Sequence, residues 1–259
     1  MFIATDDGAR IHVEAAPDSG KPPLVFSNSL GTNLHMWDAQ MGAFGEHFRV
    51  IRYDSRGHGR SDAPEGAYSI ERLGRDAIAV FDGLGIKRTS FCGLSKGGMV
   101  GQWLGAHASD RIARLVVSNT AAYIPAPDLW NQRIEVASTK GMGALAKGII
   151  ERWFTPEFRA ANPGEIERIT NMVLATPPLG YAACCIAIRD MDQRDAIRSV
   201  TAPTLVVIGE RDPATPPDRG REIHERIKGS KLTLLDAAHL SNIERTDAFN
   251  RYVLGFLTQ

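Results

Sequence analysis

Hydrophobic and polar residues alternate with two different periods over the first 120 positions of the chain. Short apolar or β-branched runs at residues 11–13, 24–26, 50–53, 89–92 and 115–117 are typical of buried strands. Between them, apolar residues recur three or four positions apart, most clearly over residues 69–84, where Ser69 is placed to cap a helix. Strands that alternate with helices predict βαβ units, and therefore a mostly parallel sheet with helices on both faces.

The pattern changes between about residues 121 and 199, where strand-like runs disappear. Helical patterns separated by Pro and Gly cover residues 128–138, 142–153, 166–174 and 181–189. Strand-like runs return at residues 204–208 and 232–235, with helices expected at about 218–227 and 247–257. We therefore expect residues 1–120 and 200–259 to form an α/β core, and residues 121–199 to form an inserted helical cap over one end of the sheet.

Composition narrows the function classes. The chain has 259 residues, of which 43% are hydrophobic and 23% charged, as expected of one α/β domain with an insertion. Lys and Arg together equal Asp and Glu at 30 each, so no global field favours nucleic acid. No apolar run approaches the roughly 18 residues that span a membrane. The first residues also lack the basic and apolar regions of a signal peptide.

The cysteines indicate the compartment. Cys92, Cys184 and Cys185 lack metal-ligand spacing, and the two adjacent residues are poorly placed to pair with each other. We expect all three to be small buried side chains in a reducing environment. The sequence therefore predicts a cytoplasmic protein that needs no metal.

The segment Gly93-Leu94-Ser95-Lys96-Gly97 points to nucleophilic catalysis. A G-x-S-x-G segment that follows a strand and opens a helix holds its serine on a sharp turn. The hydroxyl then lies at a helix N-terminus, where negative charge is stabilised. An ordinary glycine-rich turn is the alternative, but the strand–turn–helix context favours Ser95 as a nucleophile.

A serine hydroxyl needs a base, and the base needs a carboxylate to orient it. Asp212 follows the predicted strand at 204–208, and His239 follows the one at 232–235, so both lie at carboxyl ends of strands in the order Ser, acid, His. We predict His239 as the general base and Asp212 as the acid, with Glu210 and Asp236 as nearby competitors. The other histidines of interest fall in helical patterns or in a loop whose glycines and arginines look structural: His107, His224 and His58.

An oxyanion hole requires two backbone N–H donors. One is expected from Lys96, which follows the nucleophile. The other is expected from the loop after the strand at 24–26, residues 27–32 (Ser-Asn-Ser-Leu-Gly-Thr). Counting back from Trp37, residues 28–31 stand where many hydrolases carry His-Gly-aromatic-Gly, which selects the Leu30 N–H.

These segments make the chain similar to the α/β-hydrolase superfamily over its whole length. Residues 27–32, 52–59, 91–95 and 238–244 resemble those of 3-oxoadipate enol-lactonases. The resemblance implies a mostly parallel eight-stranded sheet with helices on both faces and an inserted helical cap. It also implies cofactor-free opening of a lactone made from protocatechuate or catechol in bacterial aromatic degradation. One residue departs from the resemblance, because such enzymes usually carry Met where this chain has Lys96.

The lactone implied by the resemblance is anionic, so a cation is expected near the cap. Arg133 in the first cap helix is the preferred candidate, with Lys96 as a second one. Trp130 and Trp153 are expected to contact the substrate, Trp153 as an apolar wall. The alternative interpretation of Arg133 and Trp153 is a surface arginine and a core tryptophan.

Two further functions remain open on the sequence alone. A carboxylesterase or a C–C bond hydrolase would use the same triad, and a non-catalytic receptor would use the same capped pocket. A dehydrogenase is disfavoured because Gly141-Met142-Gly143 lacks the rest of a dinucleotide fingerprint, and no H-E-x-x-H segment occurs. Ser at position 95 excludes the aspartate nucleophile of haloalkane dehalogenases. Nothing in the sequence indicates the oligomeric state.

Overall fold

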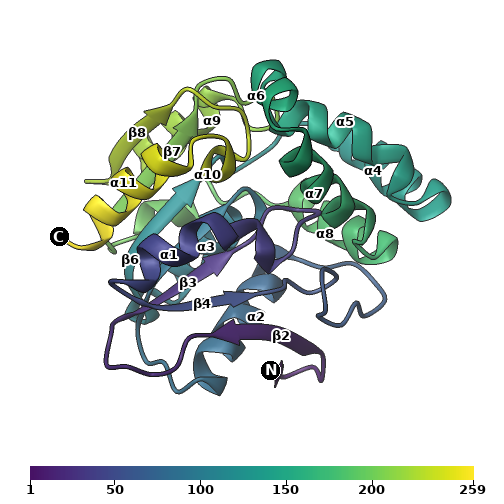
Figure 1. The fold of residues 1–259 in the computed structure, drawn as a ribbon. Helices are drawn as coiled ribbons and strands as arrows, with labels where there is room; N and C mark the ends of the chain where they lie inside the picture. Colours follow the sequence, from purple (N-terminus) through teal and green to yellow (C-terminus); the bar gives the residue numbers. More distant parts are fainter.

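An eight-stranded sheet forms the centre of the computed structural model, which describes residues 1–259 (Figure 1). The strands lie in the order β1-β2-β4-β3-β5-β6-β7-β8. The first two pair antiparallel and the other six run parallel. Their bounds are β1 Phe2–Ala4, β2 Arg10–Ala15, β3 Pro23–Ser27, β4 Arg49–Tyr53, β5 Thr89–Leu94, β6 Ile112–Ser118, β7 Thr204–Gly209 and β8 Lys231–Leu235.

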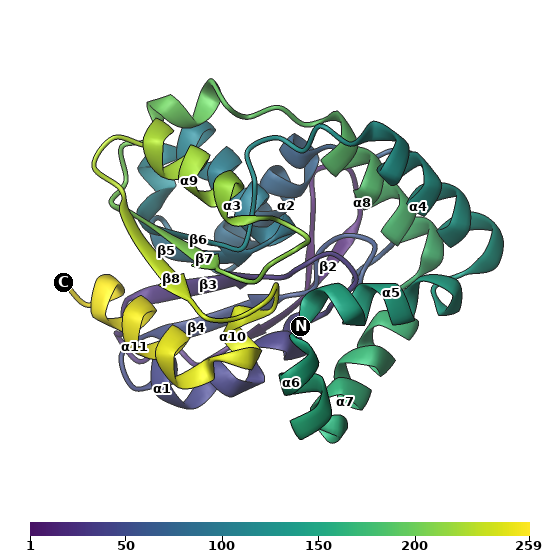
Figure 2. The same cartoon turned by 90° about the horizontal axis from the view of Figure 1, so that it is seen from above.

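Helices cover both faces of the sheet, as the alternating pattern predicts. Figure 2 shows α2, α3 and α9 on one face and α1 and α11 on the other, with the short α10 beside α11. Every residue of β5 and of β7 is buried, as expected for central parallel strands covered on both faces. The bounds are α1 Met41–Gly45, α2 Ile70–Gly83, α3 Lys96–His107, α9 Pro217–Arg226, α10 Ser241–Glu244 and α11 Thr246–Leu257.

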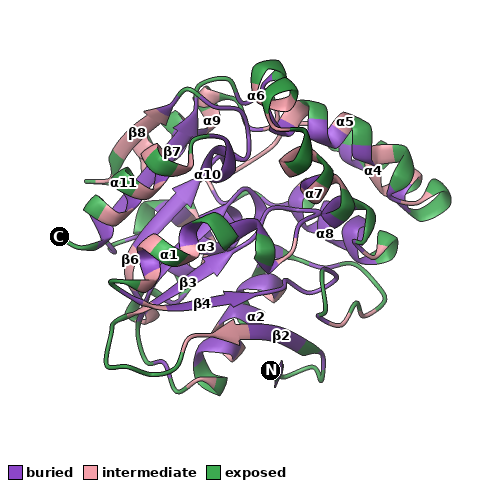
Figure 3. Ribbon diagram, viewed as in Figure 1, coloured by how far each residue is buried: buried purple, intermediate pink, exposed green.

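Five helices occupy the chain between β6 and β7 and gather beside the sheet (Figures 1 and 2). They are α4 Pro127–Lys140, α5 Gly143–Trp153, α6 Pro156–Ala161, α7 Pro163–Leu174 and α8 Pro178–Asp190. Four of them begin at a proline, whose fixed φ and missing N–H suit the first turn of a helix. Their outer surfaces are exposed, whereas α8 is largely buried (Figure 3). We call these five helices the helical insertion.

The predicted elements agree closely with the observed ones. All seven predicted strands are present, and Ser69 caps α2 by accepting a hydrogen bond from the Arg72 N–H at 3.0 Å. The pattern missed β1, α1, α6 and α10, which have between three and six residues each. Elements this short cover less than two helical turns or two strand repeats, so they leave no readable period.

All three cysteines are buried and free, as predicted. No single helix is long and apolar enough to cross a membrane. The pair α7 and α8, bent by 90° at its break, passes that test of length and composition only when taken together.

Candidate active site

Ser95 lies on the turn between β5 and α3 in a strained backbone conformation. Its φ of 56° and ψ of −116° fall in a region that residues with a side chain rarely adopt. The turn is fixed from both sides, because the Ser95 N–H donates to the Ser118 carbonyl at 2.9 Å and Thr120 Oγ1 donates to the Ser95 carbonyl at 2.7 Å. The side chain is thereby held at the N-terminus of α3.

The two glycines of the motif are required by close backbone packing. A Cβ on Gly93 would lie 2.1 Å from the Gly97 carbonyl oxygen, and a Cβ on Gly97 would lie 2.1 Å from the Ser27 carbonyl oxygen. Both distances are far below van der Waals contact. The sequence motif therefore reflects a turn in which β5, α3 and the end of β3 touch through their backbones.

His239 follows β8 and pairs with Asp212, which follows β7. His239 Nδ1 donates to Asp212 Oδ2 at 2.8 Å, and both side chains are buried. The carboxylate accepts four more hydrogen bonds, from the backbone N–H groups of Ala214 and Thr215 and from the side chains of Thr215 and Asn119. Because Nδ1 carries the proton, the neutral imidazole has its lone pair on Nε2.

Asp212 is held in its ionised form. Burial raises the pKa of Asp212, but the charge of His239 and the hydrogen bonds from His239, Asn119 and Thr215 outweigh it and leave the pKa below its ordinary value. The two other carboxylates considered as the acid, Asp236 and Glu210, lie in different surroundings. Asp236 is exposed and pairs with Arg245 at 3.1 Å, and Glu210 is exposed.

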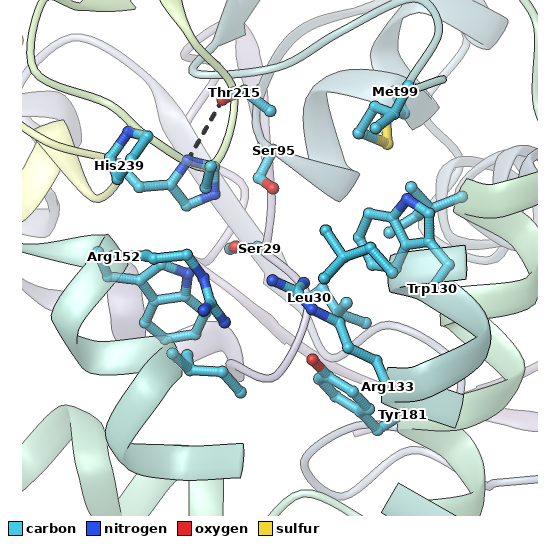
Figure 4. Close-up of a pocket in the computed structure, with 17 residues that line it drawn as sticks. Ser29, Leu30, Ser95, Met99, Trp130, Arg133, Arg152, Tyr181, Thr215 and His239 are labelled. Carbon is cyan, nitrogen blue, oxygen red and sulfur yellow. Dashed lines mark hydrogen bonds between the residues drawn. The ribbon is translucent and has the colours of Figure 1, made fainter. Parts of the chain in front are cut away.

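One cavity brings most of the predicted site residues together. Ser95 and His239 line it, and Figure 4 shows the serine hydroxyl beside the imidazole. The Ser95 hydroxyl has no hydrogen-bond partner within the protein, and catalytic hydrogen bonds often close only around a substrate. Residues Leu30, Trp130, Arg133 and Trp153 line the same cavity. The indole of Trp153 stacks on the His239 ring at a centroid distance of 6.4 Å.

The two predicted oxyanion donors flank the nucleophile. The Leu30 N–H makes no hydrogen bond within the protein, and the Lys96 N–H belongs to the first turn of α3, which lacks intrahelical partners. The loop that carries Leu30 is tied to the motif, because the Gly97 N–H donates to the Asn28 carbonyl at 3.0 Å. The arrangement offers two N–H groups for a developing oxyanion.

Two arginines from different helices reach the cavity. Arg133 from α4 and Arg152 from α5 both line it, on opposite sides in Figure 4. Neither takes part in any of the ion pairs or side-chain hydrogen bonds of the protein; the Arg133 guanidinium lies over the Trp130 ring, 4.8 Å from its centroid. Burial, together with the charge of Arg133, lowers the pKa of Arg152. Two cations without an anion in one cavity suit an anionic ligand.

The side chain of Lys96 does not belong to this cavity, which corrects its candidacy as a carboxylate partner. It is fully buried, does not line the cavity, and its Nζ has no hydrogen-bond partner. Burial lowers its pKa. The helix N-terminus at which Lys96 stands directs its side chain into the protein, so only its backbone faces the chemistry.

Sequence reasoning missed several residues of the site because they come from distant parts of the chain. Arg152 precedes Trp153 in α5 and carries no motif, and Tyr181 comes from α8. Asn119 directly follows β6, and its place as a polar residue at the end of a strand was the only sequence feature that could have indicated a role in the site. The remaining unanticipated residues support or line the site: Thr215, Ile149, Met99 and His58.

A family model of the alpha/beta hydrolase fold matches residues 22–246 of the chain. The chain therefore belongs to the α/β-hydrolase family, as its fold and its resemblance predict.

Within the family, the chain is similar to known enol-lactonases. It is 41% identical to 3-oxoadipate enol-lactonase 2 of Acinetobacter baylyi over 233 residues, covering 90% of this chain and 87% of that protein. It is 35% identical to 3-oxoadipate enol-lactonase 1 of the same organism over 257 residues, covering 99% and 96%. The crystal structure of the enol-lactonase from Burkholderia xenovorans superposes with a TM-score of 0.98 at 42% identity, over 100% of both chains. The predicted resemblance to enol-lactonases, and thus to ester hydrolases, is confirmed.

Proposed function

We propose that the protein is a serine hydrolase that opens the ring of 3-oxoadipate enol-lactone to give 3-oxoadipate. The observation that carries the proposal is the cavity in which Ser95 and His239 stand together with two unpaired guanidinium groups, Arg133 and Arg152. A hydrolase of neutral esters has no need for such charge. The names of the most similar relatives point in the same direction.

In the proposed first half-reaction, His239 Nε2 removes the hydroxyl proton as Ser95 Oγ attacks the lactone carbonyl carbon. The Leu30 and Lys96 N–H groups stabilise the resulting oxyanion, which is the largest single contribution in many such enzymes. The ring C–O bond then breaks and the departing enol oxygen takes the proton from His239. The opened chain stays attached to Ser95 as an ester, and its enol becomes the ketone.

In the second half-reaction, His239 removes a proton from water, which attacks the ester carbonyl carbon. The tetrahedral intermediate collapses as the C–O bond to Ser95 breaks and the serine regains its proton from His239. Asp212 holds the imidazole in the Nδ1–H tautomer and stabilises the imidazolium formed in each half-reaction. No cofactor is needed in this sequence.

The substrate carboxylate is assigned to the two arginines. A buried anion without a partner is costly, and a guanidinium fork offers a carboxylate two parallel hydrogen bonds. Trp130 and Trp153 line the same cavity and supply apolar walls for the ring. We assign the helical insertion, predicted as residues 121–199, the role of a cap that closes over this small anionic partner.

The biological setting belongs to the same proposal. The relatives' names give an enol-lactone of this kind as their substrate, and we assign it to bacterial degradation of aromatic compounds, as the sequence resemblance implies. We propose a cytoplasmic location, supported by the three buried free thiols, which suit a reducing compartment.

The test compares two substrates in one spectrophotometric assay: the acidic enol-lactone and a neutral aryl ester of similar size. Replacing Arg133 or Arg152 by Ala should lower kcat/KM for the lactone by about 10–150-fold, the effect of losing one charge-assisted hydrogen bond worth about 1.5–3 kcal/mol. The neutral ester should be spared, because its turnover does not need the cations. Lys96→Met should leave the ratio of the two kcat/KM values unchanged.

Arg198→Ala is the matched control, since Arg198 is exposed on a different segment and does not line the cavity. Equal losses of kcat/KM on both substrates would mean that the arginines stabilise the structure and do not recognise the substrate carboxylate. Comparable kcat/KM values of the wild-type protein for the aryl ester and for the lactone would favour a broad carboxylesterase. Binding of the lactone without turnover would favour a receptor.

A further inference from the structure

His58 contacts the loop that presents the Leu30 N–H. It lies in the connection between β4 and α2 and is fully buried. Its Nε2 accepts a hydrogen bond from the Gly31 N–H at 2.9 Å. Gly31 directly follows Leu30, so the imidazole fixes the peptide group next to the one that carries the oxyanion donor.

This hydrogen bond is the strongest restraint on the N–H groups of residues 29–32. The Ser29 N–H faces Met36 Sδ at 3.3 Å, and a thioether sulfur is a weak acceptor. The Thr32 N–H closes a turn onto the Ser29 carbonyl at a long 3.3 Å. The Leu30 N–H is unused. Thr32 Oγ1 also closes the segment internally by donating to the Ser29 carbonyl at 2.9 Å. Among the backbone N–H groups of the segment, however, only that of Gly31 has a strong acceptor, and this acceptor is the imidazole.

The imidazole is itself held in the form that this contact requires. His58 Nδ1 lies 3.2 Å from the Arg56 carbonyl oxygen, which accepts its proton and leaves the Nε2 lone pair for Gly31. Burial, with a smaller contribution from the positive charge of Lys96, keeps the pKa of His58 well below its usual range. A protonated ring would direct a second N–H at the Gly31 N–H and break the contact.

The His58 segment packs closely against the helical insertion. Gly57, with φ of +76°, approaches Gly180 of α8 so closely that a Cβ on Gly57 would lie 2.7 Å from the Gly180 Cα. Cys184 Sγ on the same helix lies 4.0 Å from His58 Nδ1. A side chain held on both sides can transmit its position to the loop.

We propose that His58 is a positioning residue that, as a neutral hydrogen-bond acceptor for the Gly31 N–H, aims the Leu30 N–H at the oxyanion. The inference rests on the proposed serine-hydrolase chemistry but not on the identity of the lactone. The role of His58 requires a hydrogen-bond acceptor at the position of Nε2 and no proton transfer to the substrate.

Two variants of similar size separate this role from simple packing. In His58→Gln, the amide oxygen reaches the place of Nε2 and still accepts from Gly31; in His58→Leu no acceptor remains. With a small neutral aryl acetate as the probe, His58→Leu should lower kcat by about 10–100-fold with KM changed less than about threefold, the scale of a misplaced oxyanion donor. His58→Gln should keep kcat within about threefold.

A second readout reports the oxyanion hole directly. An aryl boronic acid forms a tetrahedral adduct with a serine hydroxyl, so its affinity should fall in His58→Leu by about the same factor as kcat and remain in His58→Gln. His224→Leu is the matched control, because His224 on α9 is half-buried and bonds Ser230 outside the cavity. It should change stability without changing kcat or boronic acid affinity.

Equal kcat losses in His58→Leu and His58→Gln, or an unchanged boronic acid affinity in His58→Leu, would overturn the inference. Should His58→Leu not fold, His58→Asn carries the same comparison with His58→Gln, because its amide ends at the place of Nδ1 and does not reach Gly31. If the wild-type protein is inactive on the lactone but the His58 variants still differ in this way on the aryl acetate, only the lactone assignment is refuted.

Discussion

Among single residues, the acid of the proposed catalytic pair shows how the surroundings distinguish one carboxylate from its neighbours. Asp212 and Asp236 stand at comparable places in the sequence, each in the loop after a strand. Asp212 is buried and accepts hydrogen bonds from His239, Asn119 and the Thr215 loop, which together keep its pKa low. Asp236 faces solvent and pairs with Arg245.

We therefore predict a strong asymmetry between Asp212→Asn and Asp236→Asn. The amide at position 212 donates toward His239 Nδ1 and favours the wrong imidazole tautomer, so kcat should fall by up to about 10⁴-fold while the protein stays folded. Asp236→Asn breaks only two exposed ion pairs, with Arg245 and with Arg211, and the loss of each changes stability by about 0–1 kcal/mol. Steady-state kinetics with thermal unfolding of both variants is the measurement, and the reverse pattern of kcat would reassign the acid.

The candidate site residues that could be predicted from the sequence are those that stand in local backbone motifs. Ser95 stands in a strand–turn–helix motif, and Asp212 and His239 follow strands in the expected order, so each was readable from its neighbours. Arg152 and His58 were not. Their roles arise from contacts with residues far away in the chain, His58 with Gly31 and Arg152 with the cavity around Ser95. A single sequence does not indicate such long-range contacts.

At the scale of elements, the contact between the β4–α2 connection and α8 joins the core to the helical insertion. Gly57 and Gly180 meet backbone to backbone, and a Cβ on Gly180 would lie 2.4 Å from the Gly57 carbonyl oxygen. On its two sides stand His58, which contacts the Leu30 loop, and Tyr181, which lines the cavity. The geometry of the site thus depends on a close approach that only glycine permits.

Gly180→Ala should consequently separate α8 from the core and lower both stability and activity. Overpacking of this kind costs about 1–3 kcal/mol. Gly255→Ala in the last turn of α11 is the matched control, because an added Cβ there would have nothing within 4 Å and alanine should stabilise the helix by up to about 1 kcal/mol. Urea unfolding of the two variants gives the comparison, and a Gly180→Ala protein as stable and active as wild type would show that the contact is not needed.

Elements were predictable in proportion to their length and burial. The long buried strands β5 and β7 and the amphipathic α2 display clear periods, whereas β1 and α10 are too short to display any. The presence of helices between β6 and β7 was predictable because strand-like runs stop at β6 and resume at β7. The packing of its helices against one another was not, since the sequence says which face is apolar but not what covers it.

For the whole molecule, charge is balanced globally and concentrated locally. Lys and Arg equal Asp and Glu at 30 each, and most arginines are paired with carboxylates at the surface. Arg133 and Arg152 are exceptions in that they line a cavity and have no carboxylate partner. The selection of an anionic ligand that we propose is therefore a property of the site and not of the overall charge, and composition alone could not predict it.

The measurement that tests the account most directly is the intact mass of the protein, acid-quenched during turnover of the enol-lactone. Opening a ring releases no leaving group, so an acyl-enzyme on Ser95 must carry the whole mass of the lactone, located in the peptide that contains residues 93–97. Ser95→Ala should show no adduct and a kcat lowered by at least about 10³-fold. An adduct on another residue, or an unmodified wild-type protein together with a fully active, folded Ser95→Ala variant, would contradict it.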